Sequence, residues 1–169
     1  MDISLHDHLT AEEVAEVLAL VDEVTDADGA RPISEHVMLH LRHGGDEHDC
    51  HLLARDANRA LVGYLHLDAT DAVAGASAEL AVSPRARRQG VASSMVKSAM
   101  SSYQGKWFRL WAHGEDHGAH GLAHSLGFTR VRTLFQMRRS LYSALPEALI
   151  PAGFTLRTFK VGQDEEVVL

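Results

Sequence analysis

The sequence predicts an α/β fold with one mixed sheet, and three observations support this prediction. Two stretches with helical spacing of apolar residues open the chain, two strand patterns separated by a polar turn follow, and strands then alternate with helices. A hairpin joins antiparallel strands, whereas strands connected through helices lie parallel. We therefore expect both kinds of strand pairing in one sheet, with helices flanking it.

The first two elements are expected to be helices. Thr10 and Glu13 have the spacing of a capping box, and apolar residues recur at helical spacing behind them until Gly29. Ser34 begins a shorter helix, which Gly44 ends. The residues that follow are polar and are expected to form a loop.

Five strands and two further helices are expected after that loop. The strands cover residues 51–55, 60–67, 78–82, 107–112 and 131–137. The helices cover residues 90–102 and 117–126. Residues 56–59 have the composition of a turn, so the first two strands are expected to form a hairpin.

Composition narrows the class of protein. The chain of 169 residues has 16 Lys and Arg against 23 Asp and Glu, and its net charge of −7 disfavours nucleic acid or anionic lipid as a partner. Its one cysteine, Cys50, cannot form an internal disulfide and is typical of a reducing compartment. No apolar run of ~18 residues and no signal peptide is present, so we expect a cytoplasmic protein without a membrane span.

A basic loop before the expected helix at residues 90–102 is the most informative segment. Arg85, Arg87 and Arg88 concentrate positive charge in an otherwise acidic chain. Gly90 permits a tight bend, and the free amides of the helix start that follows attract anions. The segment therefore favours a pyrophosphate site, with an ordinary helix start and solvent-facing arginines as the alternative.

Two motifs in this region and beyond it resemble the GNAT acetyltransferase family. Arg87-x-x-Gly90-x-Ala92 resembles the acyl-CoA motif of the family, and residues 122–128, which end in Gly-Phe, resemble its second characteristic helix. The resemblance implies the GNAT fold and acetyl-CoA as cosubstrate. It implies that the pantetheine arm pairs with the strand backbone at Leu80, Ala81 and Val82. It places the pyrophosphate on the loop amides of Arg88, Gln89, Gly90, Val91, Ala92 and Ser93. A bulge that splays the parallel strands at residues 78–82 and 107–112 is expected to admit the arm.

Longer stretches resemble one branch of that family, the mycothiol synthases. They cover residues 28–35, 51–55, 61–67, 110–114 and 136–139, with Leu145-Pro146 following. The resemblance implies acetylation of the cysteinyl amine of a cysteine–glucosamine–inositol conjugate. These enzymes have two GNAT domains, which makes a second GNAT domain, normally in the same chain, the expected partner. We therefore expect a GNAT domain at residues 1–139, a linker at 140–151, and the truncated start of a second GNAT domain at 152–169.

Candidate catalytic residues are few. Glu79 is the candidate general base, with a solvent-facing strand residue as the alternative. Glu35 matches a position that contacts substrate in the family, and the alternative is a first-turn carboxylate favoured by the helix dipole. Ala123 stands where GNAT enzymes often carry a tyrosine that protonates the leaving thiolate.

The family resemblance implies a division of labour in which the second domain performs the chemistry and this one binds acetyl-CoA. Two alternatives remain open. One is a stand-alone GNAT enzyme that acetylates another amine, which turnover by the chain alone would favour. The other is a non-catalytic acetyl-CoA-binding or structural module, which binding without turnover would favour.

The chain has 12 histidines, so a metal site has to be considered. Two triplets have the spacing of one helix face: His36, His40 and His43, and His117, His120 and His124. Cys50 and the carboxylates supply no recognised ligand series with them, so we expect no metal. The histidines are expected to be exposed, and to gain charge below pH ~6.5.

Overall fold

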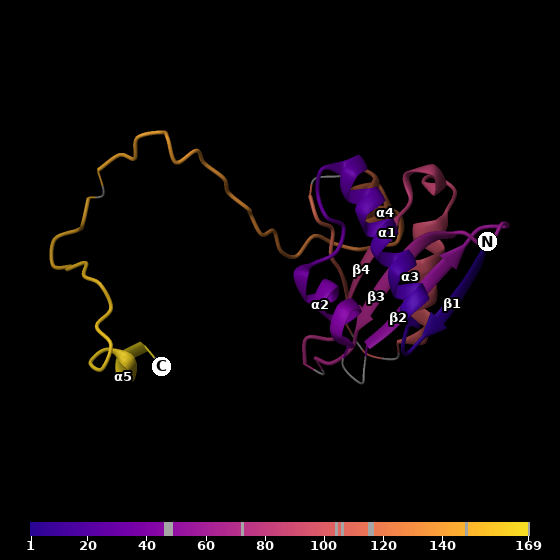
Figure 1. Ribbon diagram of the computed structural model, residues 1–169, viewed down its shortest axis with the longest axis horizontal. Helices are drawn as coiled ribbons and strands as arrows, with labels where there is room; N and C mark the ends of the chain where they lie inside the picture. The colour runs from indigo at the N-terminus through magenta and orange to yellow at the C-terminus, as the bar shows by residue number, and fades with distance from the viewer. Residues whose placement is uncertain are drawn as a thin grey trace. The chain divides into compact units, whose positions relative to one another are not determined.

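A five-stranded sheet forms the centre of residues Met1–Arg130, the first of two units in the computed structural model (Figure 1). The structure describes residues 1–45, 49–71, 73–103, 105, 107–114, 117–147 and 149–168. The strands are β1 (Asp2–His6), β2 (Asp49–Arg55), β3 (Leu61–Asp68), β4 (Ala76–Val82) and β5 (Phe108–Leu110). The helices are α1 (Ala11–Asp28), α2 (Glu35–His43), the 3-10 turn η1 (Pro84–Ala86), α3 (Val91–Ser102), α4 (His117–Ser125) and α5 (Glu165–Val168).

The sheet is mixed, which confirms the prediction. Its order is β1-β2-β3-β4-β5, in which β1 to β4 are antiparallel neighbours and β5 lies parallel to β4. The β2–β3 hairpin contains a register shift between Ala54 and Arg55. Beyond that shift His51 lies opposite His66, and His66 lies opposite Glu79 of β4. Cross-strand partners share a face of the sheet, so these three polar side chains lie on one side.

Strand β1 was not among the expected elements. It pairs antiparallel with β2 at the edge of the sheet, from Asp2 opposite Arg55 to His6 opposite His51. Its two apolar residues are only partly covered, and Leu5 is 48% exposed. The segment does alternate polar and apolar residues, but two apolar positions in a five-residue edge strand are too few to identify it from sequence.

Two hydrophobic cores lie on opposite faces of the sheet. On one face α1 and α2 pack Val21 and Val37 against Tyr64 of β3. On the other face α3 packs Met95 and Val96, and partly buried side chains of α4 join this core. Figure 1 shows the same arrangement, with α1 and α3 on opposite sides of the strands.

The ends of the first two helices match their sequence signals. Thr10 and Glu13 form the expected capping box, and Gly29 ends α1 in the left-handed conformation, with φ of 68°. The Ser34 side chain accepts a hydrogen bond from the Val37 amide and so caps α2. These caps fix where α2 begins, which matters for the site described below.

The second unit, Val131–Leu169, departs from the prediction. The expected strand at residues 131–137 does not form, and residues 152–160 form no strand either. Most large apolar side chains of this unit are more than half exposed. A strand needs a neighbouring backbone for its hydrogen bonds, and no described residue supplies one to these segments. The short helix α5 forms near the end of this unit.

Candidate functional site

The two parallel strands of the sheet separate soon after they begin to pair. β4 is in register with β5 only from Ala76 to Ala78, after which the Trp111 amide donates to the Ala78 carbonyl at 3.0 Å. No further pair of these strands occurs among the described residues, because β5 ends at Leu110 while β4 continues to Val82. The expected splay is therefore present. The expected bulge is not, because β4 keeps an unbroken register with β3.

The backbone of Leu80 faces the gap that this separation leaves. Alternate residues of a strand direct their backbone groups to the same side. The Ala76 amide and the Ala78 carbonyl both bond toward β5, so Leu80 directs its amide and carbonyl that way as well. Val82 has the same orientation. Ala81 instead directs its backbone groups toward β3, as does Ser83, whose amide donates to the Val62 carbonyl. Leu80 thus offers one donor and one acceptor to an extended ligand.

The loop after β4 presents backbone amides at the start of α3. Arg88 and Gly90 both adopt left-handed conformations, with φ of 60° and 83°. Glycine accepts such an angle readily, but an arginine there is uncommon. Gly90 is the N-cap of α3 and no side chain caps this helix. The first-turn amides, Val91, Ala92 and Ser93, are therefore available to an anion.

The three arginines of this loop have different roles. Arg87 forms a bidentate ion pair with Asp28 of α1, with both N–O distances at 2.8 Å. The Ser83 hydroxyl also donates to a carboxylate of α1 at 2.9 Å. Arg85 and Arg88 are exposed and form no ion pair with the described residues. Arg87 therefore shapes the loop, while Arg85 and Arg88 supply its accessible positive charge.

Glu79 lies on β4 at the beginning of the gap. Its Oε2 accepts hydrogen bonds from the Ser34 amide at 2.5 Å and from His113 Nε2 at 3.1 Å. The side chain is only 12% exposed, so a solvent-facing strand residue is ruled out. Burial raises the pKa of the Glu79 carboxyl, but the hydrogen bonds from His113 and Ser34 outweigh burial and hold the pKa below its usual range. A carboxylate this weakly basic is a poor proton acceptor at neutral pH.

His113 is a site residue that the sequence reasoning missed. It follows β5, and because β5 runs parallel to β4 its imidazole meets Glu79 from the neighbouring strand. The imidazole is 29% exposed, so it combines an orienting carboxylate with access to solvent, as a general acid or base requires. One signal was available, since ligands of α/β sheets bind beyond the carboxyl ends of parallel strands.

The other two positions singled out from the sequence are Glu35 and Ala123. Glu35 lies in the first turn of α2, 66% exposed, and forms an ion pair with Arg31 at 2.8 Å. It follows Ser34, so it lies one residue from the amide that binds Glu79. Ala123 is partly buried in α4 and has no hydroxyl to donate a proton.

Buried histidines correct the expectation that these side chains are exposed. His51 and His66 are 6% and 1% exposed, and the side chain of His40 is 13% exposed. His51 Nδ1 lies 2.9 Å from the Tyr64 hydroxyl, and burial together with His66 lowers the pKa of His51 to about 4. The histidines of α4 are exposed as expected: His117, His120 and His124.

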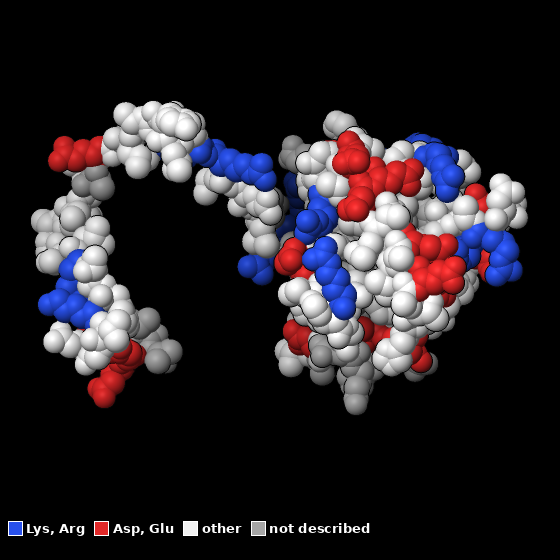
Figure 2. Space-filling model, viewed as in Figure 1, with Lys and Arg blue, Asp and Glu red and all other residues white. Residues whose placement is uncertain are grey.

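The surface charge of the chain agrees with its composition. On the face shown in Figure 2, acidic and basic side chains of the first unit are interspersed rather than gathered into one basic surface. Nucleic-acid binding normally requires such a basic surface. Among the residues that the structure describes, no helix is long and apolar enough to cross a membrane.

Comparison with known proteins identifies the relatives of this chain. Residues 47–130 match the acetyltransferase (GNAT) domain family. The chain is 46% identical to the mycothiol acetyltransferase of Acidothermus cellulolyticus over 166 residues, which cover 97% of this chain and 50% of that protein. It is 48% identical to the mycothiol acetyltransferase of Streptosporangium roseum, with coverage of 94% and 46%. The chain thus spans about half the length of the curated relatives it matches.

Solved structures share the fold at lower identity. A GCN5-related N-acetyltransferase from Sphaerobacter thermophilus superposes with a TM-score of 0.67 at 20% identity, covering 98% of this chain and 56% of that one. A GNAT superfamily phosphinothricin acetyltransferase from Sinorhizobium meliloti, solved in complex with AcCoA, has a TM-score of 0.55 at 17% identity and 75% coverage of each chain.

Proposed function

Because this chain belongs to the GNAT acetyltransferase family, we propose that it is the acetyl-CoA-binding, amino-terminal half of a mycothiol-type N-acetyltransferase. The observation that carries the proposal is the gap beside Leu80, followed along the chain by the uncapped amides of α3. The whole enzyme would transfer the acetyl group of acetyl-CoA to the cysteinyl amine of a cysteine–glucosamine–inositol conjugate. Identity of 46% and 48% to two mycothiol acetyltransferases supports this acceptor.

Acetyl-CoA is proposed to bind with its pantetheine arm extended along β4. Leu80 would then exchange hydrogen bonds with the amide groups of the arm, as a neighbouring strand would. The pyrophosphate would lie on the amides of residues 88–93, where the dipole of α3 favours negative charge. Arg85 and Arg88 would add charge attraction, and the ion pair of Arg87 would hold the loop in place.

The chemical step has only part of its apparatus in this chain. Acetyl transfer needs a neutral amine, a polarised thioester carbonyl and a proton for the departing thiolate. The Leu80 amide is placed to polarise a carbonyl in the gap, and His113, oriented by Glu79, is the best proton acceptor for the amine. Ala123 supplies no acid for the thiolate. We therefore assign most of the catalysis to a second domain, and Glu35 to acceptor contact.

A second GNAT domain would also account for the unit that follows residue 130. We infer a first domain of residues 1–139, a linker of 140–151, and the beginning of another GNAT domain at 152–169. The exposed apolar side chains of Val131–Leu169 support the presence of a covering partner. The use of acetyl-CoA as donor and the free thiol of Cys50 both favour a cytoplasmic location.

Calorimetric titration of the 169-residue chain with acetyl-CoA tests the proposal. We expect saturable 1:1 binding and a rise in thermal midpoint. Absence of both heat and stabilisation at millimolar acetyl-CoA would reject it. Desulfo-CoA, which keeps the pyrophosphate and the pantetheine arm but lacks the thiol, is the control ligand. It should bind with an affinity similar to that of acetyl-CoA.

Turnover separates the proposal from its two alternatives. The chain alone, given acetyl-CoA and the conjugate, should release CoA far more slowly than when a separately produced second half is added. Efficient turnover of another amine by the chain alone would favour a stand-alone enzyme. Binding without restored turnover would favour a non-catalytic module.

A further inference from the structure

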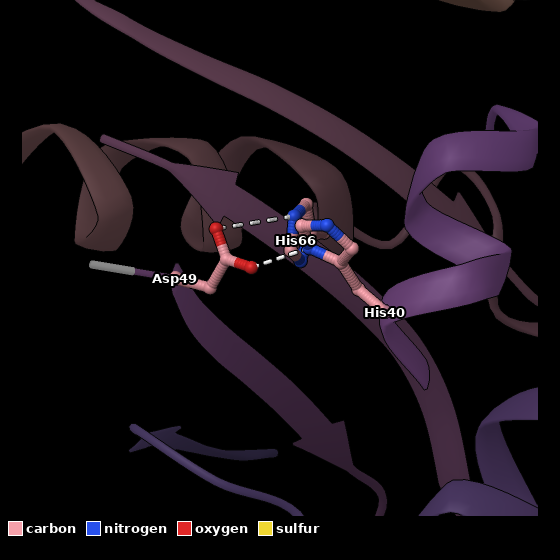
Figure 3. Close-up of side chains that lie close together, drawn as sticks. All are labelled: His40, Asp49 and His66. Carbon is pink, nitrogen blue, oxygen red and sulfur yellow. Dashed lines mark hydrogen bonds and ion pairs between the residues drawn. The ribbon is translucent and has the colours of Figure 1, made fainter. Parts of the chain in front are cut away.

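Two histidines and one aspartate converge on the α2 side of the sheet. His40 comes from α2, Asp49 from the start of β2, and His66 from β3, and Figure 3 shows their side chains pointing toward one another. His40 Nδ1 lies 2.5 Å from Asp49 Oδ2, and His66 Nε2 lies 3.8 Å from Asp49 Oδ1. One ligand atom from each residue lies within 4.8 Å of the other two.

We propose that His40, Asp49 and His66 bind a divalent transition-metal ion, with zinc as the preferred ion. Two imidazole nitrogens and a carboxylate oxygen are ligands that Zn²⁺ takes, and a water completes four-coordination. Tetrahedral bonds of about 2.0–2.2 Å place neighbouring ligand atoms ~3.3 Å apart. The His66–Asp49 contact of 3.8 Å is already near that spacing. The His40–Asp49 hydrogen bond has to lengthen by only ~1 Å.

His66 is the residue that points most directly to a ligand. It is 1% exposed, and neither of its ring nitrogens has a hydrogen-bond partner among the described residues. Buried polar atoms nearly always have a partner, so two unpartnered nitrogens on one ring need an explanation. A metal ion bound at one of these nitrogens would supply a partner for it.

The neighbouring residues define the site further. Asp49, His51 and Leu53 alternate onto the α2 side of β2, so Cys50 points to the other face and is not a ligand. The Cys50 thiol instead lies 3.9 Å from Asp7. The proposed ligand set is thus two imidazoles and one carboxylate.

An ion at this position would connect α2 to two strands of the sheet. His66 lies opposite Glu79, and Glu79 binds the amide of Ser34 at the start of α2. Fixing His40 to β2 and β3 would therefore hold α2 against the sheet. The role inferred is structural, and it does not depend on whether the chain binds acetyl-CoA.

Zinc binding by the chain at pH 7.5, after treatment with EDTA and its removal, tests the site. The readouts are the stoichiometry of ZnCl₂ binding by calorimetry, the thermal midpoint, and the visible spectrum of the Co²⁺ form, which reports four-coordination. His40→Gln and Asp49→Asn are the test variants. The control replaces the exposed α4 triplet, His117, His120 and His124, with Gln. MgCl₂ is the ligand control, since Mg²⁺ prefers oxygen ligands.

We expect one Zn²⁺ per chain, a raised thermal midpoint, and affinity weakened by on the order of 100-fold or more in both test variants but not in the α4 control. The His40 side chain is 13% exposed against 2% for that of His66, so His40→Gln should retain cooperative unfolding in EDTA even if a variant of His66 does not fold. Three results would overturn the proposal: no zinc-dependent stabilisation, equal affinity in His40→Gln and the unmodified chain, or loss of binding in the α4 control.

Discussion

The carboxylate of Glu79 accepts a hydrogen bond from the backbone amide of Ser34, which lies 45 residues earlier in the chain. The bond ties the N-cap residue of α2 to β4 at the point where β4 and β5 separate. His113 binds the same oxygen from the other side of the gap. Three distant segments therefore meet at one carboxylate, where the acceptor side of the site is expected.

Removal of this charge should weaken the fold at neutral pH. We expect Glu79→Gln to lower the free energy of unfolding by about 1–2 kcal/mol at pH 6, because a charged acceptor is lost. The folded pKa of Glu79 is depressed, so its contribution is present above pH 4.5 and is lost as the pH falls through the folded pKa. Urea unfolding at pH 6 and pH 3 should show the difference between variant and parent shrinking. Glu147→Gln, at an exposed position, is the control and should have no effect at either pH.

Buried His51 should make the protein less stable in mild acid. Its pKa is about 4 in the folded chain against 6.5 in the unfolded one, so between these values the unfolded chain binds the extra proton. Stability attributable to His51 is therefore lost as the pH falls from 6.5 toward 4. We expect the unmodified chain to lose about 2 kcal/mol more than His51→Gln between pH 7 and pH 5. Equal losses in urea unfolding of the two proteins would contradict the burial of a neutral imidazole.

The accessible charge of the basic loop should govern donor affinity. We expect Arg88→Glu to weaken acetyl-CoA binding about 10-fold or more, since an attraction to the pyrophosphate becomes a repulsion. Lys97→Glu makes the same charge change on an exposed position of α3 and should alter affinity little. Calorimetry on both variants at two salt concentrations measures this. If both variants weakened acetyl-CoA binding to a similar degree, the affinity would depend on the overall charge of the protein and not on the position of Arg88.

Two glycines should respond to alanine in opposite directions. Gly90 has φ of 83°, which disfavours any side chain, so Gly90→Ala should destabilise the protein by about 1 kcal/mol. Gly121 lies within α4, and an added Cβ would meet no atom within 4 Å. Gly121→Ala should therefore stabilise the protein by up to about 1 kcal/mol through helix propensity. Thermal or urea unfolding measures the change in stability of each variant. A loss of stability in Gly121→Ala would contradict the placement of α4.

Local signals explain why much of the first unit could be predicted. Thr10 with Glu13, Ser34 and Gly29 define helix ends by hydrogen bonds and backbone angles that involve only near neighbours. The start of α3 is likewise determined by residues adjacent in sequence, the basic loop and Gly90. For that reason the loop that we propose binds the donor could be predicted from sequence, whereas Glu79 could be named but its partners could not.

The remaining features depend on long-range pairing, which local pattern does not specify. The register shift between Ala54 and Arg55 is one residue, yet it decides that His51 and His66 share a face. Without the shift, His51 would lie opposite Leu65 and the polar cluster would be divided between two faces. Residues 131–137 were expected to form a strand, but a strand also requires a partner that the described residues do not provide.

The most direct test of the donor site follows the backbone amides of the 169-residue chain by ¹H–¹⁵N NMR during titration with acetyl-CoA. The amides of Leu80, Val91 and Ala92 should shift together and saturably, because one ligand would contact both the gap and the start of α3. Their failure to shift at saturating ligand, or saturable shifts confined to α2 and residues beyond 130, would contradict the proposed site.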